Sequence, residues 1–205
     1  MKRRRRFLTQ LGAFGAMTAF DASEMEAALA PAAGKWDMSW VDALASAQYR
    51  VVFNAEEIAD GAAMDYAEVF LDHFREAQGT TDAQTRPVIV FRRLGTPMAL
   101  DDVLWDRYGV GEDSKITDSR THAAAKRNIY KPRIETLRQR GLISLVCSIA
   151  LGNWSSRAAK RSGRKVDEVL ADARANLIPG TIIVPSGIFA LIRAQNAGCA
   201  FMPGT

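Results

Sequence analysis

The pattern of apolar and polar residues alternates along the chain between segments typical of strands and segments typical of helices. Runs rich in β-branched and aromatic residues predict five strands, at 49–55, 86–93, 142–150, 180–187 and 199–202. Apolar residues spaced three and four positions apart predict helices between them, at 61–77, 96–109, 131–141, 153–176 (one or two helices) and 186–198. The chain from 110 to 128 is polar and irregular, which predicts a long loop.

This alternation of strand and helix predicts an α/β domain, with a mostly parallel sheet and helices on both faces. Five strands suit a flavodoxin-like three-layer sandwich with the strand order 2-1-3-4-5. In that order one strand separates the strand that carries Cys147 from the strand that begins at Cys199. Two strand spacings exceed the reach of a disulfide, so we expect both cysteines to be free thiols.

The first 32 residues have the composition of an export signal. A basic start is followed by an uncharged stretch at 7–20, which is too short to span a bilayer as a helix. The sequence RRRFL at 4–8 resembles the twin-arginine signal, and Ala30-Pro31-Ala32 offers a cleavage site. A basic amphipathic arm on a cytosolic protein is the alternative.

We therefore predict a periplasmic protein with a signal peptide at 1–32, an N-terminal arm at 33–48 and one α/β domain at 49–205. The 205-residue chain has a formal net charge of +4, and removing the five basic and three acidic residues of the leader lowers it to +2. So small an excess of basic residues does not indicate a nucleic-acid partner. We expect contact with a membrane only through the leader, during export.

The sequence contains few motifs that carry chemistry. No Gly-rich dinucleotide or phosphate-binding motif is present, and His73 and His122 lie far from each other and from the cysteines, so we expect neither a cofactor nor a metal. Ser186, within Pro-Ser-Gly, fits the N-cap of the last helix better than a nucleophile. Arg92 and Arg93 follow the second strand, at the edge where doubly wound sheets bind ligands, although they also fit a solvated strand end.

The carboxyl-terminal third carries a more specific signal. The segment GLISLVCSIALGN, followed by LIPGTIIVPSGIFALIRAQNAGCAFM, resembles the DsrE/DsrF-like sulfur-relay family, in particular its exported subgroup with twin-arginine leaders. The resemblance implies a flavodoxin-like fold and assembly as a homo-oligomer or with related DsrE-like subunits. It also implies that some members carry a persulfide on the cysteine that follows the third strand, the position of Cys147.

Two functions remain open from the sequence. The first is a small oligomeric binding or carrier protein of sulfur metabolism, without robust catalysis, in which Cys147 is a packed core residue. The second is a sulfurtransferase-type sulfur carrier that forms a persulfide on Cys147. In either case the ligand would be a small sulfur species, and the candidate binding residues are Arg92, Arg93, Asn153 and Ser186.

Overall fold

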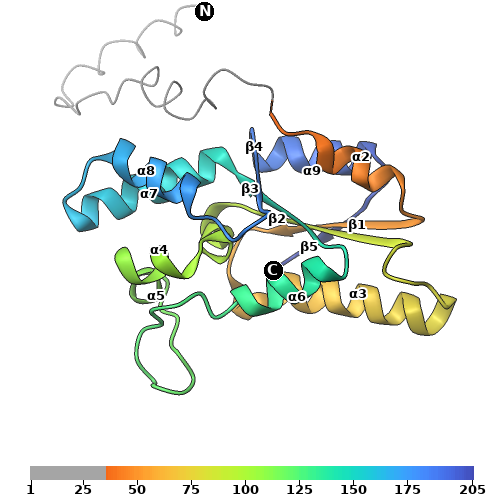
Figure 1. Cartoon of the computed structure of the whole chain (residues 1–205), viewed down its shortest axis with the longest axis horizontal. Coiled ribbons are helices and arrows are strands. Elements are labelled where there is room, and N and C mark those ends of the chain that lie inside the picture. Colours follow the sequence, from red (N-terminus) through yellow and green to blue (C-terminus); the bar gives the residue numbers. More distant parts are fainter. Residues whose placement is uncertain (1–35) are drawn as a thin grey trace, which may run out of the picture.

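The computed structural model describes residues 36–205, so the predicted signal peptide lies outside the described residues. The described chain forms a five-stranded sheet between layers of helices (Figure 1). Its strands are β1 (Tyr49–Ala55), β2 (Thr85–Phe91), β3 (Ile143–Cys147), β4 (Ile182–Val184) and β5 (Ala200–Pro203). All neighbouring strands are parallel, which confirms the predicted α/β class.

The strand order is β4-β3-β2-β1-β5, so the predicted order 2-1-3-4-5 is wrong. From β1 to β4 each strand is added beside the previous one, and the chain then returns to pair β5 with the free side of β1. Right-handed crossovers on one face of a sheet advance in one direction, and a crossover on the other face advances in the opposite direction. The last helix, at Gly187–Asn196, covers the face opposite to the helices that precede β2 and β3. Its crossover therefore runs in the opposite direction and places β5 beside β1.

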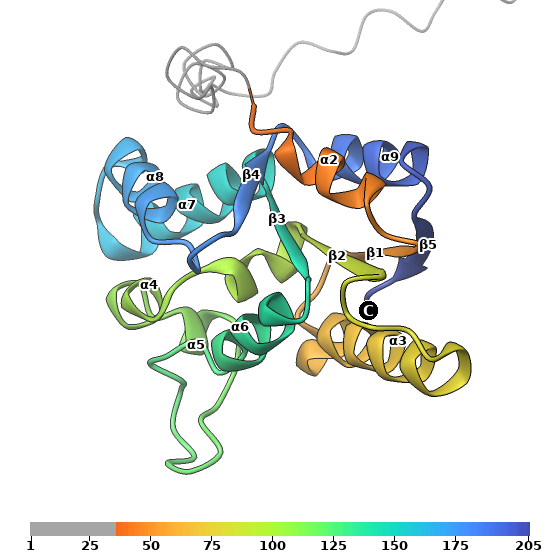
Figure 2. The same ribbon diagram turned by 45° about the vertical axis from the view of Figure 1, so that its right-hand side comes forward.

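The helices form two layers and a group at one end of the sheet (Figure 2). One face is covered by α2 (Ser39–Ala45) and α9 (Gly187–Asn196), and the other by α3 (Ala62–Gln78) and α6 (Lys131–Gln139). Beyond the carboxyl ends of the strands lie α4 (Asp102–Arg107), α5 (Val110–Asp113), α7 (Ser148–Ser162) and α8 (Val166–Ala175). Two 3₁₀ helices, η1 (Ala59–Gly61) and η2 (Arg93–Ala99), follow β1 and β2.

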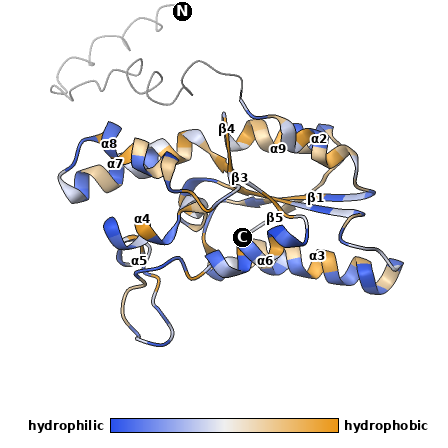
Figure 3. Cartoon of the chain, viewed as in Figure 1, coloured by the Kyte–Doolittle hydropathy of each residue, from blue (hydrophilic) through white to orange (hydrophobic). Residues whose placement is uncertain are grey.

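Strand alternation divides the core into two parts. Val51 and Phe53 of β1 point to the α3 face, and Val52 between them points to the α9 face. On the α9 face the cluster includes Trp40 of α2, which is fully buried and attaches the N-terminal arm to the domain. Figure 3 shows hydrophobic and hydrophilic bands alternating along α3, as expected of a helix with one buried flank.

Helix α3 confirms the helix predicted at 61–77. It ends at Gly79, whose φ of +64° suits a residue without a Cβ and whose N–H donates to the Arg75 carbonyl. One flank of α3 carries carboxylates that pair with two arginines, one in α6 and one directly after it: Arg133 pairs with Asp65 and Glu68, and Arg140 pairs with Asp72.

Two predicted elements are divided in the structure. The apolar run at 142–150 is a strand only to Cys147, and its last three residues form the first turn of α7. The helix predicted at 96–109 is split into η2 and α4 by Leu100, whose backbone is extended. The buried side chain of Asn128 donates to the carbonyls of Met98 and Leu100, which satisfies the backbone groups that the break exposes.

The polar segment predicted as a long loop begins with the short helix α5 and continues as a projecting loop (Figure 2). Thr117 and Ala124 form an isolated antiparallel bridge within it, and the Asp118 carboxylate accepts hydrogen bonds from the N–H groups of Arg120 and Thr121. None of the helices in residues 36–205 is long and apolar enough to cross a membrane.

Candidate functional site

Cys147 is the last residue of β3 and the N-cap of α7. Its Sγ accepts a hydrogen bond of 3.4 Å from the N–H of Ala150, in the first turn of the helix. The residue is 6% exposed, so the thiol lies just below the surface. A sulfur atom at the N-terminus of a 15-residue helix is in a position where the helix dipole favours negative charge.

The loops after β3 and β4 meet beside this cysteine. Cys147 pairs with Val184 of β4, and the hydroxyl of Ser148 donates a hydrogen bond of 3.1 Å to the Pro185 carbonyl. Ser186 caps α9, as predicted, and its Oγ accepts a hydrogen bond of 3.0 Å from the Phe189 N–H. The N-termini of α7 and α9 therefore lie next to each other at the carboxyl edge of the sheet.

Arg92 extends from the neighbouring strand toward the same place. Phe91 of β2 pairs with Val146 of β3, and one further step of this register brings Arg92 beside Cys147, about one strand spacing (~4.8 Å) away. Strand alternation turns both side chains to the α9 face, since Val90 and Leu145, two residues earlier, belong to the core on that face. The thiol and the guanidinium side chain thus share one edge and one face.

The side chain of Arg92 is fixed by two neighbours. Its aliphatic stem packs against Gly187, the first residue of α9, and its guanidinium forms an ion pair with Glu56, which follows β1. The Nε atom of Arg92 is buried and has no hydrogen-bond partner within residues 36–205. One N–H donor of the guanidinium is therefore unpaired within the described residues.

Glu56 is the residue of this cluster that sequence analysis missed. It accepts hydrogen bonds from the amide of Asn54, at 3.0 Å, and from Arg92, and these two donors hold the pKa of its carboxyl below the ordinary value. The available signal was its position, because Glu56 is the first polar residue after β1, as Arg92 is after β2. Glu56 offsets part of the positive charge at this edge.

The other predicted binding residues differ in their positions. Arg93 is mostly exposed, with its Nε 3.6 Å from Glu56 Oε2, so it is at the edge of the cluster. Asn153 is exposed on α7, six residues and about 9 Å of helix rise beyond Cys147. Within the described part of the chain, no hydrogen bond joins Asn153 to the other candidate residues. The structure therefore brings together Cys147, Arg92 and Ser186, with Arg93 at the edge and Asn153 outside.

The second cysteine is far from this cluster. Cys147 ends β3, whereas Cys199 immediately precedes β5, so the two lie at opposite ends of their strands, which β2 and β1 separate. Both are free thiols, as predicted, although the intervening strands are β2 and β1 rather than β4. Burial raises the pKa of Cys199 to about 11, which keeps this thiol protonated at neutral pH.

Residues 36–205 contain no group of three or more His, Cys, Asp or Glu side chains placed to hold a metal ion. No protein-family model and no curated protein matches the chain. Among solved structures, the chain is similar to a protein of unknown function, MTH1491 from Methanobacterium thermoautotrophicum. The two share 17% identity with a TM-score of 0.46, over 76% of this chain and 98% of that chain.

Proposed function

We propose that this protein is an exported, oligomeric, DsrE-like carrier of sulfur metabolism that binds a small anionic sulfur species at the carboxyl edge of the sheet. The observation that carries the proposal is the side-by-side position of Arg92 and Cys147. A guanidinium with an unpartnered N–H donor and the N-terminus of α7 both favour an anion beside the thiol. The sequence resemblance supplies the sulfur chemistry and the periplasmic location.

Reversible binding agrees better with the geometry than catalysis does. Cys147 is nearly covered, and the described residues place no histidine or lysine within hydrogen-bond distance of its sulfur to act as a base. The Arg92–Glu56 ion pair leaves the cluster of Arg92, Arg93 and Glu56 with a net charge of about +1, enough to favour a small anion without holding it irreversibly.

One observation favours the alternative, a persulfide on Cys147. Its sulfur already accepts an N–H from the first turn of α7, and the same contact would stabilise a thiolate. That thiolate would attack the outer sulfur of thiosulfate, forming the new S–S bond while the S–S bond to the sulfonate breaks and sulfite leaves. The product would be a cysteine persulfide anion, and the reaction needs no added oxidant or reductant.

Equilibrium dialysis with labelled thiosulfate tests the binding. We expect saturable binding by the wild type and a loss of affinity of about tenfold in Arg92→Gln, since a charge-assisted hydrogen bond is removed. Arg157→Gln is the matched control, because Arg157 is exposed on α7 away from the cluster. Absence of binding by the wild type, or equal loss in both variants, would refute the proposal.

Intact-mass analysis after the same incubation separates the two functions. A carrier retains thiosulfate binding in Cys147→Ser and acquires no adduct. A sulfurtransferase-type protein gains about 32 Da, the mass of one sulfur atom, in the wild type and not in Cys147→Ser. Release of the added sulfur by cyanide would confirm that the adduct is a persulfide.

A further inference from the structure

The two edges of the sheet differ in how they are covered. At one edge, β4 is half-buried or buried along its length. At the other, all four residues of β5 are exposed, and no strand within residues 36–205 pairs with its outer side. The outer backbone groups of β5 are therefore open to a further strand.

The exposed side chains of β5 are apolar on both faces of the sheet. Phe201 and Met202 are 44% and 46% exposed. Phe201 is paired with Val52 and so lies on the α9 face, whereas Met202 is paired with Phe53 and lies on the α3 face. The strand has no lysine or other charged residue of the kind that protects edge strands in soluble proteins.

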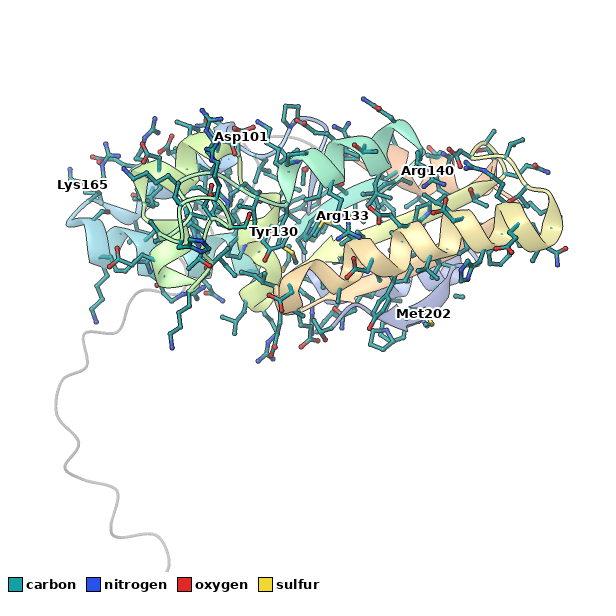
Figure 4. All side chains as sticks on the ribbon, turned by 90° about the horizontal axis from the view of Figure 1, so that it is seen from below. Asp101, Tyr130, Arg133, Arg140, Lys165 and Met202 are labelled. Carbon is teal, nitrogen blue, oxygen red and sulfur yellow. The ribbon has the colours of Figure 1, made fainter. Side chains whose placement is uncertain are left out.

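Helix α3 continues this apolar surface on one face. Tyr66 and Val69 are exposed, and the ring of Tyr66 lies 6.3 Å from that of Phe53, the strand neighbour of Met202. Figure 4 shows Met202 on one side of α3, with Arg133 and Arg140 on the other. The charged flank of α3 is thus directed at α6, and an apolar flank is directed at the edge.

Helix α9 extends the apolar surface of β5 on the opposite face of the sheet. Leu191 and Ala194 face the sheet, while Ile188 and Ile192, one turn apart, are exposed. Because α9 runs antiparallel to the strands in a right-handed crossover, this flank is turned toward β5. Six of the ten exposed large apolar side chains of residues 36–205 belong to β5 and its two flanking helices: Tyr66, Val69, Ile188, Ile192, Phe201 and Met202.

We propose that a second copy of this chain covers the edge, with β5 pairing antiparallel to its own copy about a two-fold axis normal to the sheet. The unpaired backbone groups of the open strand can accept another strand as a partner. The two-fold rotation places α9 beside its copy on one face and α3 beside its copy on the other, so apolar flanks meet on both faces. The result is a dimer with one continuous ten-stranded sheet, built from the five strands of each copy.

Charge supports a second copy of the chain as the partner. β5 carries no charge, and the carboxylates on the far flank of α3 are already paired with Arg133 and Arg140, so neither β5 nor these carboxylates bring like charges together in the symmetric contact. The inference specifies the oligomer of the proposed function but does not depend on sulfur binding. A monomeric protein that binds thiosulfate would refute the dimer alone.

Sedimentation velocity of the full-length protein tests the interface. We expect the wild type to sediment as a dimer. Phe201→Lys and Phe201→Glu should each sediment as monomers, because the two-fold axis places residue 201 of one copy near residue 201 of the other and the two introduced charges repel. Ile129→Lys is the matched control, since Ile129 is also 44% exposed but lies away from β5, and it should remain dimeric. Circular dichroism establishes that each variant is folded.

Mixing the two charged variants gives the sharpest result. Under the proposed symmetry position 201 lies close to its own copy, so an equimolar mixture of Phe201→Lys and Phe201→Glu should form dimers again through opposite charges. A dimer that persists in either single variant, or a mixture that stays monomeric, would overturn the proposal. A monomeric wild type would also overturn it, whether the edge then stays open or another segment or a different protein covers it.

Discussion

The stem of Arg92 passes so close to Gly187 that a Cβ at position 187 would lie 2.6 Å from Cδ and 3.2 Å from Cβ of Arg92. The missing side chain at the first residue of α9 therefore determines the path of the arginine. Along this path the guanidinium reaches Glu56 and the stem stays on the α9 face. One glycine thus positions the cationic group of the candidate site.

Gly187→Ala tests this relationship. The added methyl displaces the flexible Arg92 stem, so we expect a modest destabilisation of about 1–2 kcal/mol and weaker thiosulfate binding. Urea unfolding and equilibrium dialysis measure the two effects. Gly163→Ala is the control: Gly163 has a φ of +68° and no neighbour within 4 Å of an added Cβ. It should lose about 1 kcal/mol of stability through backbone strain and keep the wild-type affinity.

The ion pair of Glu56 makes a second prediction, for pH dependence. Asn54 and Arg92 lower the pKa of Glu56 in the folded protein below its usual value of 4.5, so the unfolded chain takes up this proton first as the pH falls. The stabilisation by Glu56 is complete above the unfolded pKa and is lost as the pH falls through the folded one.

Glu56→Gln removes this contribution. We expect a loss of roughly 1 kcal/mol at pH 7 and a shallower decline in stability between pH 5 and 3, measured by urea unfolding. Glu76→Gln, at an exposed position on α3 that forms no ion pair within the described residues, should follow the wild-type curve. A Glu56→Gln curve parallel to that of the wild type would contradict the assignment.

Local signals in the sequence predicted the elements that local chemistry determines. The apolar spacing on α3 and the serine cap of α9 each depend on residues within a few positions of one another, and both predictions are confirmed. The apolar run also placed Cys147 on the third strand, although its last three residues form the first turn of α7 instead of continuing the strand. For such features a single sequence carries enough information.

Other features depend on contacts between distant residues. The order of the strands depends on which face each crossover takes, and the periodicity of a helix does not record this. The helix predicted at 96–109 is interrupted because Asn128, 28 residues beyond Leu100, bonds to the backbone there. Glu56 became part of the candidate site only because β1 and β2 are neighbours, which brings it beside Arg92.

Gly95 makes a prediction about the loops that hold the site. A Cβ at this position would lie 3.0 Å from the carbonyl carbon of Ala55, nearer still to its oxygen, and 3.1 Å from the Glu57 carbonyl. These are backbone atoms that cannot move aside as a side chain can. We therefore expect Gly95→Ala to destabilise the fold by about 2–4 kcal/mol, measured by urea unfolding, well beyond the loss in Gly163→Ala. A smaller loss than in that control would show that the loops separate easily.

The buried thiol of Cys199 makes the last prediction, for chemical reactivity. It is 7% exposed, and burial raises its pKa to about 11, so at pH 8 only about one molecule in a thousand carries the thiolate that reacts with iodoacetamide. In Cys147→Ser, where Cys199 is the remaining cysteine, we expect native alkylation to be at least about 100-fold slower than in guanidinium. Peptide mass spectrometry over a time course measures both rates. Ala194 and Cys199 belong to the same core cluster. Comparable alkylation rates in the native and the guanidinium-unfolded protein would show that this packing does not protect the thiol and that the segment between α9 and β5 opens readily.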